Sequence, residues 1–336
     1  MRANPFTLHT ELVHSSSGDE LEILDLRHFN STDLRPLLEE ETELWLSKLD
    51  WDYSSSSDMI LRYVDARILP GYAAIERGRI RGYCFFVYEG AKGVIGDMFV
   101  DPFGYAPEQI RHIERELVTT TIETLQQSPG IHRVEAQLLI HGAGEASQEF
   151  IDGGFQCYSR FFMEVPIAVG LPAPSRPLRQ EIEIRPWLDG DYQPAAQIIT
   201  AAYRGHVDSD INDQYRSVPG SLRFLNNIVR FPGCGVFDAG SSFVAVHRVT
   251  RQTIGVILCS RVRQDVGHIT QVCLMPEFRS SGIGEHLIMA TAQNLRSRGA
   301  RMLSLTVTEA NDRAVSLYHR LGFTVRHTFD AFVWES

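Results

Sequence analysis

The chain has 336 residues, in which 32 basic side chains stand against 42 acidic ones, so the formal net charge is −10. Its 43% apolar and 22% charged content excludes wholesale disorder, and its length predicts two or three domains. No apolar run reaches the roughly 20 residues that a membrane-spanning helix needs, and the first residues lack the apolar core of a signal peptide. We therefore expect a cytoplasmic protein without a membrane partner.

The charge is unevenly divided along the chain. Residues 1–170 carry a net charge of −13, whereas residues 171–336 carry +3. No basic stripe offsets the acidic half, which argues against a nucleic-acid partner. The cysteines are scattered and form no C-x-x-C pair, so we expect most or all of them to be buried thiols, with no disulfide framework and no zinc site. They are Cys84, Cys157, Cys234, Cys259 and Cys273.

Strands and helices alternate in the first half. A short alternating strand at residues 21–26 precedes a helix and a hairpin region. There follow an apolar-rich strand that ends at a proline, a helix, a second strand, a helix that ends in Gly-Phe, and a final strand. Their predicted positions are residues 93–102, 108–127, 133–140, the helix before Gly154-Phe155, and 161–165.

The second half repeats this order at an offset of 168 to 174 residues. Its elements are predicted at residues 182–185, 242–249, 255–262, 267–276, 282–298, 302–308, the helix before Gly322-Phe323, and 329–334. The stretch between the halves, PIAVGLPAPSRPLRQ, holds four prolines and no amphipathic period, which predicts an extended linker. We therefore predict an α/β fold with a mixed sheet in two copies, with a domain at 1–168, a linker at 169–180 and a domain at 181–336.

A loop in the second half has the composition of a phosphate site. It reads Arg279-Ser280-Ser281-Gly282-Ile283-Gly284 and lies between a predicted strand and a predicted helix. Glycines let backbone N–H groups approach a ligand, the helix adds its positive end, and an arginine adds a full charge. A plain strand-to-helix turn explains the glycines equally well. A dinucleotide fingerprint is disfavoured, because Leu287 stands where its third glycine belongs.

The wider context of this loop resembles a known family. The loop is similar to motif A, Q/R-x-x-G-x-G/A, of the GNAT superfamily of acyl-CoA-dependent N-acyltransferases, and Val272-Cys-Leu-Met-Pro276 resembles the strand before it. The stretches Thr308-Glu-Ala-Asn-Asp-Arg-Ala314 and Tyr318-His-Arg-Leu-Gly-Phe323 resemble motif B. The resemblance covers residues 182–336 and implies two tandem GNAT-like domains, of which the second is intact.

The resemblance also implies roles for particular residues. Acetyl-CoA is the implied co-substrate, and no metal takes part. The backbone of Cys273 and Leu274 would pair with pantetheine, and the main-chain amides from Arg279 to Gly284 would hold the pyrophosphate. Asn311 and Ala314 would line the cofactor cleft. Tyr318 would face the sulfur of coenzyme A, where a phenol can protonate the departing thiolate.

The attacking amine must be neutral, so we considered which residue could take its proton. His268 lies at the start of the motif A strand, and an imidazole has a suitable pKa near neutrality. A histidine at a strand end on the surface, without a catalytic role, is at least as good an interpretation. Asp265 and Glu309 are weaker candidates, because exposed carboxylates near turns are usually only solvated.

The segment 203–237 is predicted to cover the acceptor site. It contains His206, Asp208, Asp210 and Tyr215, together with Asp213, and this set could bind an ammonium group. A solvated loop that carries a helix cap is the alternative. The acidic spacing lacks the glycine and the closing glutamate of a calcium loop, which argues against a metal.

The first half lacks the cofactor signals. Glu108 and Ile110 occupy the positions of the two glycines, and Phe150, which has no proton to give, occupies the position of Tyr318. We therefore predict a degenerate, inactive first domain. Its negative charge either steers a cationic substrate towards the second half or serves only solubility.

These observations predict an N-acetyltransferase that transfers an acetyl group from acetyl-CoA to a primary amine of a small molecule by direct attack. The alternatives are transfer of a longer acyl group, acetylation of a protein or peptide, and a module that senses acetyl-CoA without chemistry. We expect a monomer or a homodimer.

Overall fold

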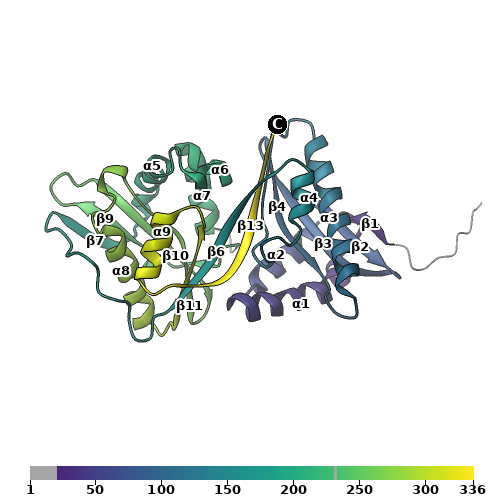
Figure 1. Ribbon diagram of the computed structural model, residues 1–336, viewed down its shortest axis with the longest axis horizontal. Helices are drawn as coiled ribbons and strands as arrows, with labels where there is room; N and C mark the ends of the chain where they lie inside the picture. Colours follow the sequence, from purple (N-terminus) through teal and green to yellow (C-terminus); the bar gives the residue numbers. More distant parts are fainter. Residues whose placement is uncertain (1–20, 231–232) are drawn as a thin grey trace, which may run out of the picture.

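The computed structural model describes residues 21–230 and 233–336. Within these residues one 13-stranded sheet runs through both halves in the order β1-β2-β3-β4-β5-β13-β6-β12-β11-β10-β9-β7, with β8 beside β10. The halves lie side by side, and the long strands β6 and β13 run between them (Figure 1). The predicted α/β fold with a mixed sheet is confirmed.

The described elements follow the predicted order. Those of the first half are β1 (Glu22–Asp25), α1 (Ser31–Leu49), α2 (Ser54–Asp65), β2 (Gly71–Glu76), β3 (Arg79–Glu89), β4 (Lys92–Val100), α3 (Pro107–Gln127), β5 (Arg133–Gln137), α4 (Ser147–Asp152) and β6 (Gln156–Pro166). Those of the second half are β7 (Ile182–Pro186), α5 (Tyr192–Ala202), α6 (Val207–Ile211), α7 (Val218–Arg230), β8 (Val236–Phe237), β9 (Phe243–His247), β10 (Thr253–Arg263), β11 (Val266–Leu274), α8 (Ile283–Ser297), β12 (Met302–Thr308), α9 (Asp312–Arg320) and β13 (Thr324–Glu335).

The last strand of each half lies in the sheet of the other half. Strand β6 belongs to the first half by sequence, yet it pairs antiparallel with β12 of the second half from Arg160 to Pro166. Strand β13 ends the second half, yet its residues from Ala331 to Glu335 pair with β5 of the first half. The two strands also pair with each other. A division of the chain near residues 168 and 181 therefore does not divide the sheet, and each half completes its sheet with a strand from the other.

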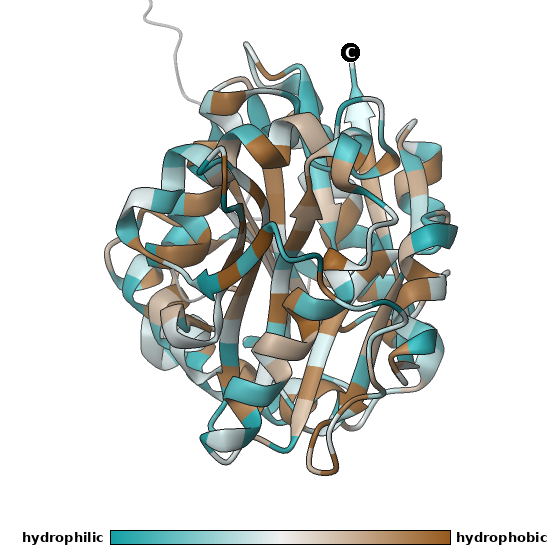
Figure 2. Ribbon diagram, turned by 90° about the vertical axis from the view of Figure 1, so that its left-hand side faces the viewer, coloured by the Kyte–Doolittle hydropathy of each residue, from teal (hydrophilic) through white to brown (hydrophobic). Residues whose placement is uncertain are grey.

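Successive residues along the strands of the second half point to opposite faces of the sheet and pack against two different layers of helices. On β9 and β10, residues such as Val244 and Val256 pack with helices α5 and α7, whereas Ala245 and Ile257 pack with α8 and α9. Figure 2 views this half from its outer end, with largely brown, hydrophobic strands between the helices. The sheet is thus buried on both faces, and residues at its strand ends are left to form a site.

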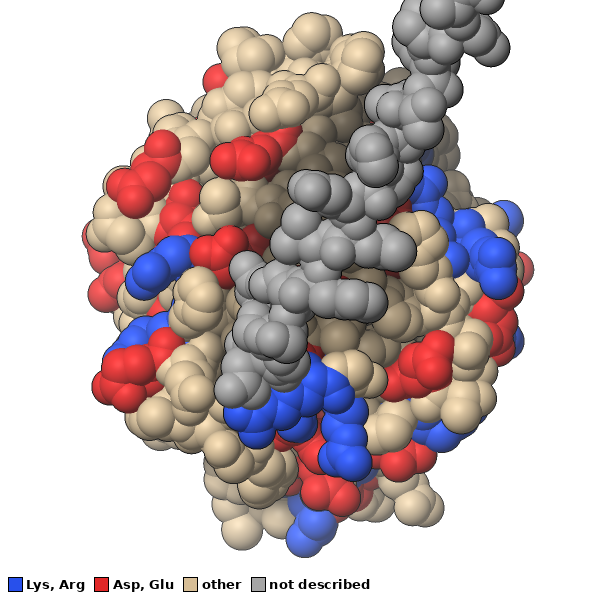
Figure 3. Space-filling view, turned by 90° about the vertical axis from the view of Figure 1, so that its right-hand side faces the viewer, with Lys and Arg blue, Asp and Glu red and all other residues tan. Residues whose placement is uncertain are grey.

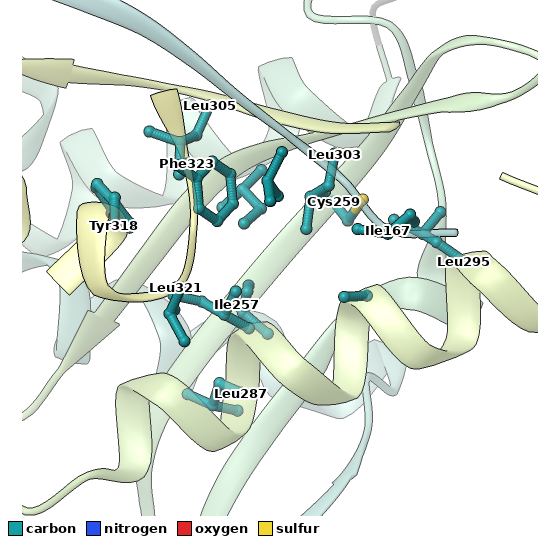
Figure 4. Close-up of a cluster of buried hydrophobic side chains, with 14 of the residues drawn as sticks. Ile167, Ile257, Cys259, Leu287, Leu295, Leu303, Leu305, Tyr318, Leu321 and Phe323 are labelled. Atoms are coloured by element: carbon teal, nitrogen blue, oxygen red, sulfur yellow. The ribbon is translucent and has the colours of Figure 1, made fainter. Parts of the chain in front are cut away.

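The linker is extended but packed rather than free. The backbone N–H of Ile167 donates to the carbonyl of Arg301 at 2.9 Å, and Leu171 and Leu178 pack against the core of the second half. Figure 4 shows Ile167 beside Leu295 of α8 in this core. The predicted linker therefore forms part of the surface of the second half.

The remaining sequence predictions concern cysteines and membranes. Cys84, Cys259 and Cys273 are buried, whereas Cys157 and Cys234 are exposed, and all five are free thiols. Among the helices of the described ranges, none has the length and apolar content needed to cross a membrane.

Candidate functional site

A wedge opens between the parallel strands β11 and β12. Their ladder ends with the pair Ile269 and Leu305, although both strands continue, to Leu274 and Thr308. A register shift between β10 and β11 leaves Thr270 as an extra residue, and such a bulge bends its strand. The edge of β11 beyond the bulge is therefore free of β12, as the predicted pairing of Cys273 and Leu274 with pantetheine would require.

The predicted phosphate loop has the backbone of an anion site. Ser280 and Gly282 both have positive φ, at 59° and 86°, so the chain takes two left-handed steps immediately before α8 begins at Ile283. Such steps turn successive N–H groups towards one side, and the helix end adds a positive dipole. Gly282 accepts this conformation without strain, which explains why glycine stands there.

Three arginines surround this loop without a carboxylate partner among the described residues. Arg176 donates to the carbonyl of Ser280 at 3.1 Å, Arg313 donates to the hydroxyl of Ser280, and Arg279 donates to the carbonyl of Ala202. No carboxylate of the described residues neutralises their positive charges. They are therefore available to a phosphate-bearing ligand.

The linker crosses the loop and takes part in its architecture. The buried carboxylate of Glu285, in the first turn of α8, accepts hydrogen bonds from the backbone and hydroxyl of Ser175 at 2.6 and 2.7 Å. The side chain of His286 contacts the carbonyl of Arg176 at 2.9 Å. The linker is thus tied to the helix whose N-terminus would face a phosphate.

A cavity of about 860 Å³ lies between this loop, β11 and α9. Of the predicted cofactor residues, Ser281 and Ile283 do not line it: Ile283 is buried beneath the loop, and the Ser281 hydroxyl donates to the carbonyl of Phe278 at 2.6 Å. The others do line it, namely Cys273, Leu274, Arg279, Ser280, Gly282, Gly284, Asn311 and Ala314. Asn311 also caps α9, because its side chain accepts from the backbone N–H of Ala314 at 3.2 Å. The spacing of Asn311 and Ala314 in motif B is therefore that of a helix N-cap and the backbone N–H that it binds.

Tyr318 lies at the junction of this cavity with a second one of about 310 Å³. It lines both cavities, and its ring lies beside Phe323 at the edge of the buried core (Figure 4). Burial, followed by the nearby Asp208 and Cys273, raises the pKa of Tyr318 well above its ordinary value. The phenol therefore stays protonated at neutral pH, as a proton donor must.

Some of the predicted acceptor residues line the two cavities and others do not. Asp208 and Tyr215 line the smaller cavity, and His206 lines the larger one. The hydroxyl of Thr308 donates to the Asp208 carboxylate. Asp210 is exposed and lies outside both cavities, while Asp213 pairs with Lys92 of the first half at 2.7 Å. Among the described residues, no cluster of ligands could hold a metal ion.

His268 lines the smaller cavity from a buried position. Its ring lies 5.0 Å from that of Trp51 and 5.8 Å from that of Phe162, both from the first half, and its Nδ1 contacts the Ser304 hydroxyl at 2.9 Å. Burial lowers the pKa of His268 to about 3, so the imidazole is neutral but holds a proton poorly. This environment differs from the predicted strand end and makes His268 a weak base.

The other two base candidates lie outside both cavities. Asp265 pairs with Arg263 at 2.6 Å and with Arg301, and these hydrogen bonds hold the pKa of Asp265 well below its usual range. Glu309 is exposed beyond the end of β12. A carboxylate held ionised by two guanidinium groups is a poor proton acceptor.

The counterpart of the wedge in the first half is filled. The β4–β5 ladder ends with Ile95 and Ala136, and Gly96 forms a bulge like that of Thr270. Here, however, the imidazole Nε2 of His141 contacts the carbonyl of Met98 at 2.8 Å, on the strand edge that corresponds to Val272. A side chain of the protein thus contacts this strand edge one residue before the counterparts of Cys273 and Leu274.

Two further features distinguish this counterpart. Phe150, at the position of Tyr318, is fully buried and stacks on Phe332 with 4.0 Å between ring centroids. Buried polar groups fill the neighbouring interior: Tyr83 donates to Glu41 at 2.6 Å and Tyr53 donates to Asp97 at 2.8 Å. These contacts support an inactive first half.

The acidic excess of the first half is dispersed on its outer end. Figure 3 shows acidic and basic side chains lying among one another wherever grey atoms do not cover this face. Several acidic groups are also paired, such as Asp50 with Arg263 and Arg326 and Glu135 with Lys92. On the described residues that this view leaves uncovered, the acidic side chains are therefore not gathered apart from the basic ones.

Sequence reasoning missed several cavity residues. Arg160 and Gln137 of the first half line the smaller cavity, as does Gln271 of β11, and Ser175 and Arg176 of the linker line the larger one. Four of the five come from outside the second domain. The proline-rich composition of the linker and the strand pattern around Arg160 gave no signal of their position.

Comparison with known families agrees with this geometry. Residues 211–323 match the family described as the acetyltransferase (GNAT) family. This stretch includes the wedge, the loop and Tyr318, so the part of the second half that matches a GNAT acetyltransferase domain is the part that forms the site. A mycothiol acetyltransferase of Thermobifida fusca is 30% identical over 181 residues, which cover 50% of this chain and 50% of that protein. The curated relatives are matched over 18% to 58% of their lengths.

Solved structures extend the likeness to the whole fold. A GCN5-related N-acetyltransferase from Sphaerobacter thermophilus superposes with a TM-score of 0.62 at 15% identity, covering 95% of this chain and 96% of that one. A tandem GNAT protein from the clavulanic acid biosynthesis pathway gives a TM-score of 0.58 at 14% identity, covering 94% and 98%. The predicted tandem GNAT architecture is therefore confirmed.

Proposed function

We propose that the protein transfers an acetyl group from acetyl-CoA to the primary amine of a small molecule by direct attack. The observation that carries this proposal is the position of Tyr318, a buried and protonated phenol at the junction of two adjoining cavities. The larger cavity has the size and charge for the cofactor, and the smaller one has room for the acceptor. The reacting atoms would then meet beside the phenol.

The residues around the larger cavity fit acetyl-CoA. The left-handed steps at Ser280 and Gly282 and the start of α8 suit a pyrophosphate, and Arg176, Arg279 and Arg313 supply unneutralised charge. The free edge of β11 suits the amides of pantetheine. Bound acetyl-CoA supplies a thioester whose carbonyl carbon accepts the amine.

The chain supplies the remaining groups. Asp208 binds the acceptor ammonium group in the smaller cavity, held in place by the Thr308 hydroxyl, and takes one of its protons. The neutral amine forms the new N–C bond as the C–S bond breaks. Tyr318 donates its hydroxyl proton to the departing thiolate, and the nitrogen of the new amide gives its second proton to the Tyr318 oxygen, which restores the phenol.

A covalent acyl-enzyme intermediate is not part of this proposal. Cys273 lines the larger cavity, but burial raises the pKa of its thiol to about 12. A thiol that stays protonated is a poor nucleophile. The amine therefore attacks the thioester itself.

The size of the smaller cavity favours a small acceptor over a folded protein. About 310 Å³ lies at the lower end of the range for small-molecule pockets. The aromatic rings of Tyr203 and Tyr215, stacked at 4.5 Å, form one of its walls. A mycothiol-type acceptor belongs among the candidates, because relatives carry that name.

A thiol-release assay tests the proposal. A panel of small primary amines is offered with acetyl-CoA, and at least one should release coenzyme A thiol and yield its N-acetyl product. Binding of acetyl-CoA without thiol release from any amine would instead identify a sensing module. Propionyl-CoA and longer acyl-CoAs, offered with the best amine, test the alternative of a longer acyl group.

A further inference from the structure

The smaller cavity contains a cation, Arg160, for which the described residues offer no carboxylate partner. Arg160 lies on β6, opposite Thr308 of β12, and lines the cavity. Its Nη1 donates to the side-chain oxygen of Gln137 at 2.6 Å, and its guanidinium lies 5.9 Å from the ring of Phe329. In the described part of the chain, neither its Nε nor its Nη2 has a hydrogen-bond acceptor, and it forms no ion pair.

The free edge of Arg160 has the geometry for a carboxylate. Nε and Nη2 are two parallel donors, the side of a guanidinium that binds both oxygens of a carboxylate at once. The Nε is also buried, and a buried donor without a partner costs free energy. A ligand carboxylate would remove that cost.

A second unpartnered donor points to the same kind of ligand. Gln271 of β11 lines the cavity and is only 5% exposed, and its buried side-chain Nε2 has no oxygen acceptor among the described residues, with only the Cys273 thiol nearby. Buried amide groups in proteins are normally hydrogen-bonded. The Nε of Arg160 and the Nε2 of Gln271 therefore both lack an acceptor oxygen in one cavity.

An anion shares this cavity with the two donors. Asp208 lines it as well; its carboxylate lies 3.5 Å from the His206 Nδ1, and among the described residues no ion pair joins it to Arg160. Opposite charges that remain apart in one cavity suit a ligand that carries both signs. We propose that the acceptor is an amine that also carries a carboxylate, and that Arg160 and Gln271 bind this carboxylate while Asp208 receives the ammonium group. This inference rests on the proposed function and adds the class of its acceptor.

The exchange of strands explains how the first half takes part. Arg160 and its partner Gln137 belong to β6 and β5, yet β6 lies in the sheet of the second half. The first half, although its own wedge is filled, thereby places a specificity residue in the acceptor cavity. It acts through a side chain at the site rather than through its overall charge.

Matched amines test the carboxylate. Glycine, alanine, leucine, phenylalanine, glutamate and lysine are each compared with their C-terminal amides in the thiol-release assay at saturating acetyl-CoA. The acids should have KM values about 10- to 100-fold below those of their amides, which is the range of a charge-assisted hydrogen bond. An amide carries the less basic amine, so intrinsic reactivity works against this preference. Equal or lower KM values for the amides would overturn the inference.

Variants assign the preference to Arg160. Arg160→Gln should raise KM for the best acid about 10-fold or more and leave KM for its amide within twofold, with kcat little changed. Arg160→Lys keeps the charge but loses the two parallel donors. Its KM for the acid should lie between those of the wild type and Arg160→Gln. Arg111→Gln, which removes an exposed arginine of α3, is the matched control and should change neither KM. An equal loss for acid and amide in Arg160→Gln would indicate a structural role only.

Failure of the proposed function is distinguishable from failure of this inference. If no amine gives thiol release, the same pairs are titrated calorimetrically into the acetyl-CoA-loaded protein. The carboxylate site would still be supported if an acid binds more tightly than its amide and if Arg160→Gln abolishes the binding of that acid. Equal binding of acid and amide, or none, would overturn it.

Discussion

Removing one oxygen atom tests the proposed role of Tyr318. The Tyr318→Phe variant keeps the ring, which is 6% exposed and lies 5.7 Å from the ring of Phe323. The hydroxyl has no hydrogen-bond partner among the described residues, so its loss removes no internal contact. We therefore expect the free energy of unfolding to change by less than about 0.5 kcal/mol, as for substitutions that break no stabilising contact.

The kinetic effect should be much larger than the effect on stability. General acid catalysis contributes about 10²- to 10⁴-fold, so kcat should fall by that factor while KM for acetyl-CoA stays within twofold. Because the pKa of Tyr318 is raised, wild-type kcat should show no decline from loss of this proton below about pH 10. The assay is thiol release with the best amine, and Tyr63→Phe, on the exposed side of α2, is the matched control. An unchanged kcat would remove Tyr318 as the acid.

Three further predictions concern the linker, His268 and the buried carboxyl groups of the first half. Arg176→Ala should raise KM for acetyl-CoA about three- to tenfold, because Arg176 lies against the phosphate loop. Arg179→Ala, at the exposed end of the linker, is the control and should leave this KM unchanged. Equal KM values for both variants would exclude a cofactor role for the linker. His268→Gln should lower kcat less than tenfold, because its pKa of about 3 makes it a weak base; a 100-fold loss would restore it as the general base. Burial raises the pKa of Asp97 and of its neighbour Glu41 above the unfolded value of about 4, so the folded state keeps protons that the unfolded state loses, and stability falls as pH rises through that range. The Tm of wild type should therefore drop more between pH 5 and pH 8 than that of Asp97→Asn, and parallel curves would contradict this assignment.

Much of the fold was predictable because each half carries local signals. Helix α3 ends at Gln127 as predicted, and β12 has the predicted bounds of Met302–Thr308. Strand β5 is shorter than predicted and ends at Gln137, because the chain turns there: the N–H of Leu139 donates to the carbonyl of Gln137. The alternation of apolar residues continues through this turn and conceals it.

The exchange of β6 and β13 was not predictable from the sequence. Each strand follows a Gly-Phe pair and has a similar apolar pattern, since the halves are copies of one unit. Either strand could therefore complete either sheet by the same hydrogen bonds. Only the packing of the whole chain decides the partner, and no local signal reports it.

The difference between local signals and long-range packing also explains which site residues the sequence could predict and which it could not. The loop around Gly282 and the capping pattern of Asn311 are local features, so the sequence could predict residues that line the larger cavity together with Tyr318. Arg160 and Arg176 reach the cavities through an exchanged strand and a linker, which are long-range features. The environment of His268 was misjudged for the same reason, because Trp51 and Phe162 that bury it come from the other half.

The central claim is a division of labour, in which the second half binds the cofactor and the first half does not. Calorimetric titration of the full chain with acetyl-CoA tests it most directly. Because His141 contacts Met98 at the first wedge and Glu108 and Ile110 replace the loop glycines, we predict one binding site per chain. A stoichiometry of two would show that the first half also binds acetyl-CoA, and the absence of binding would contradict the assignment of the larger cavity.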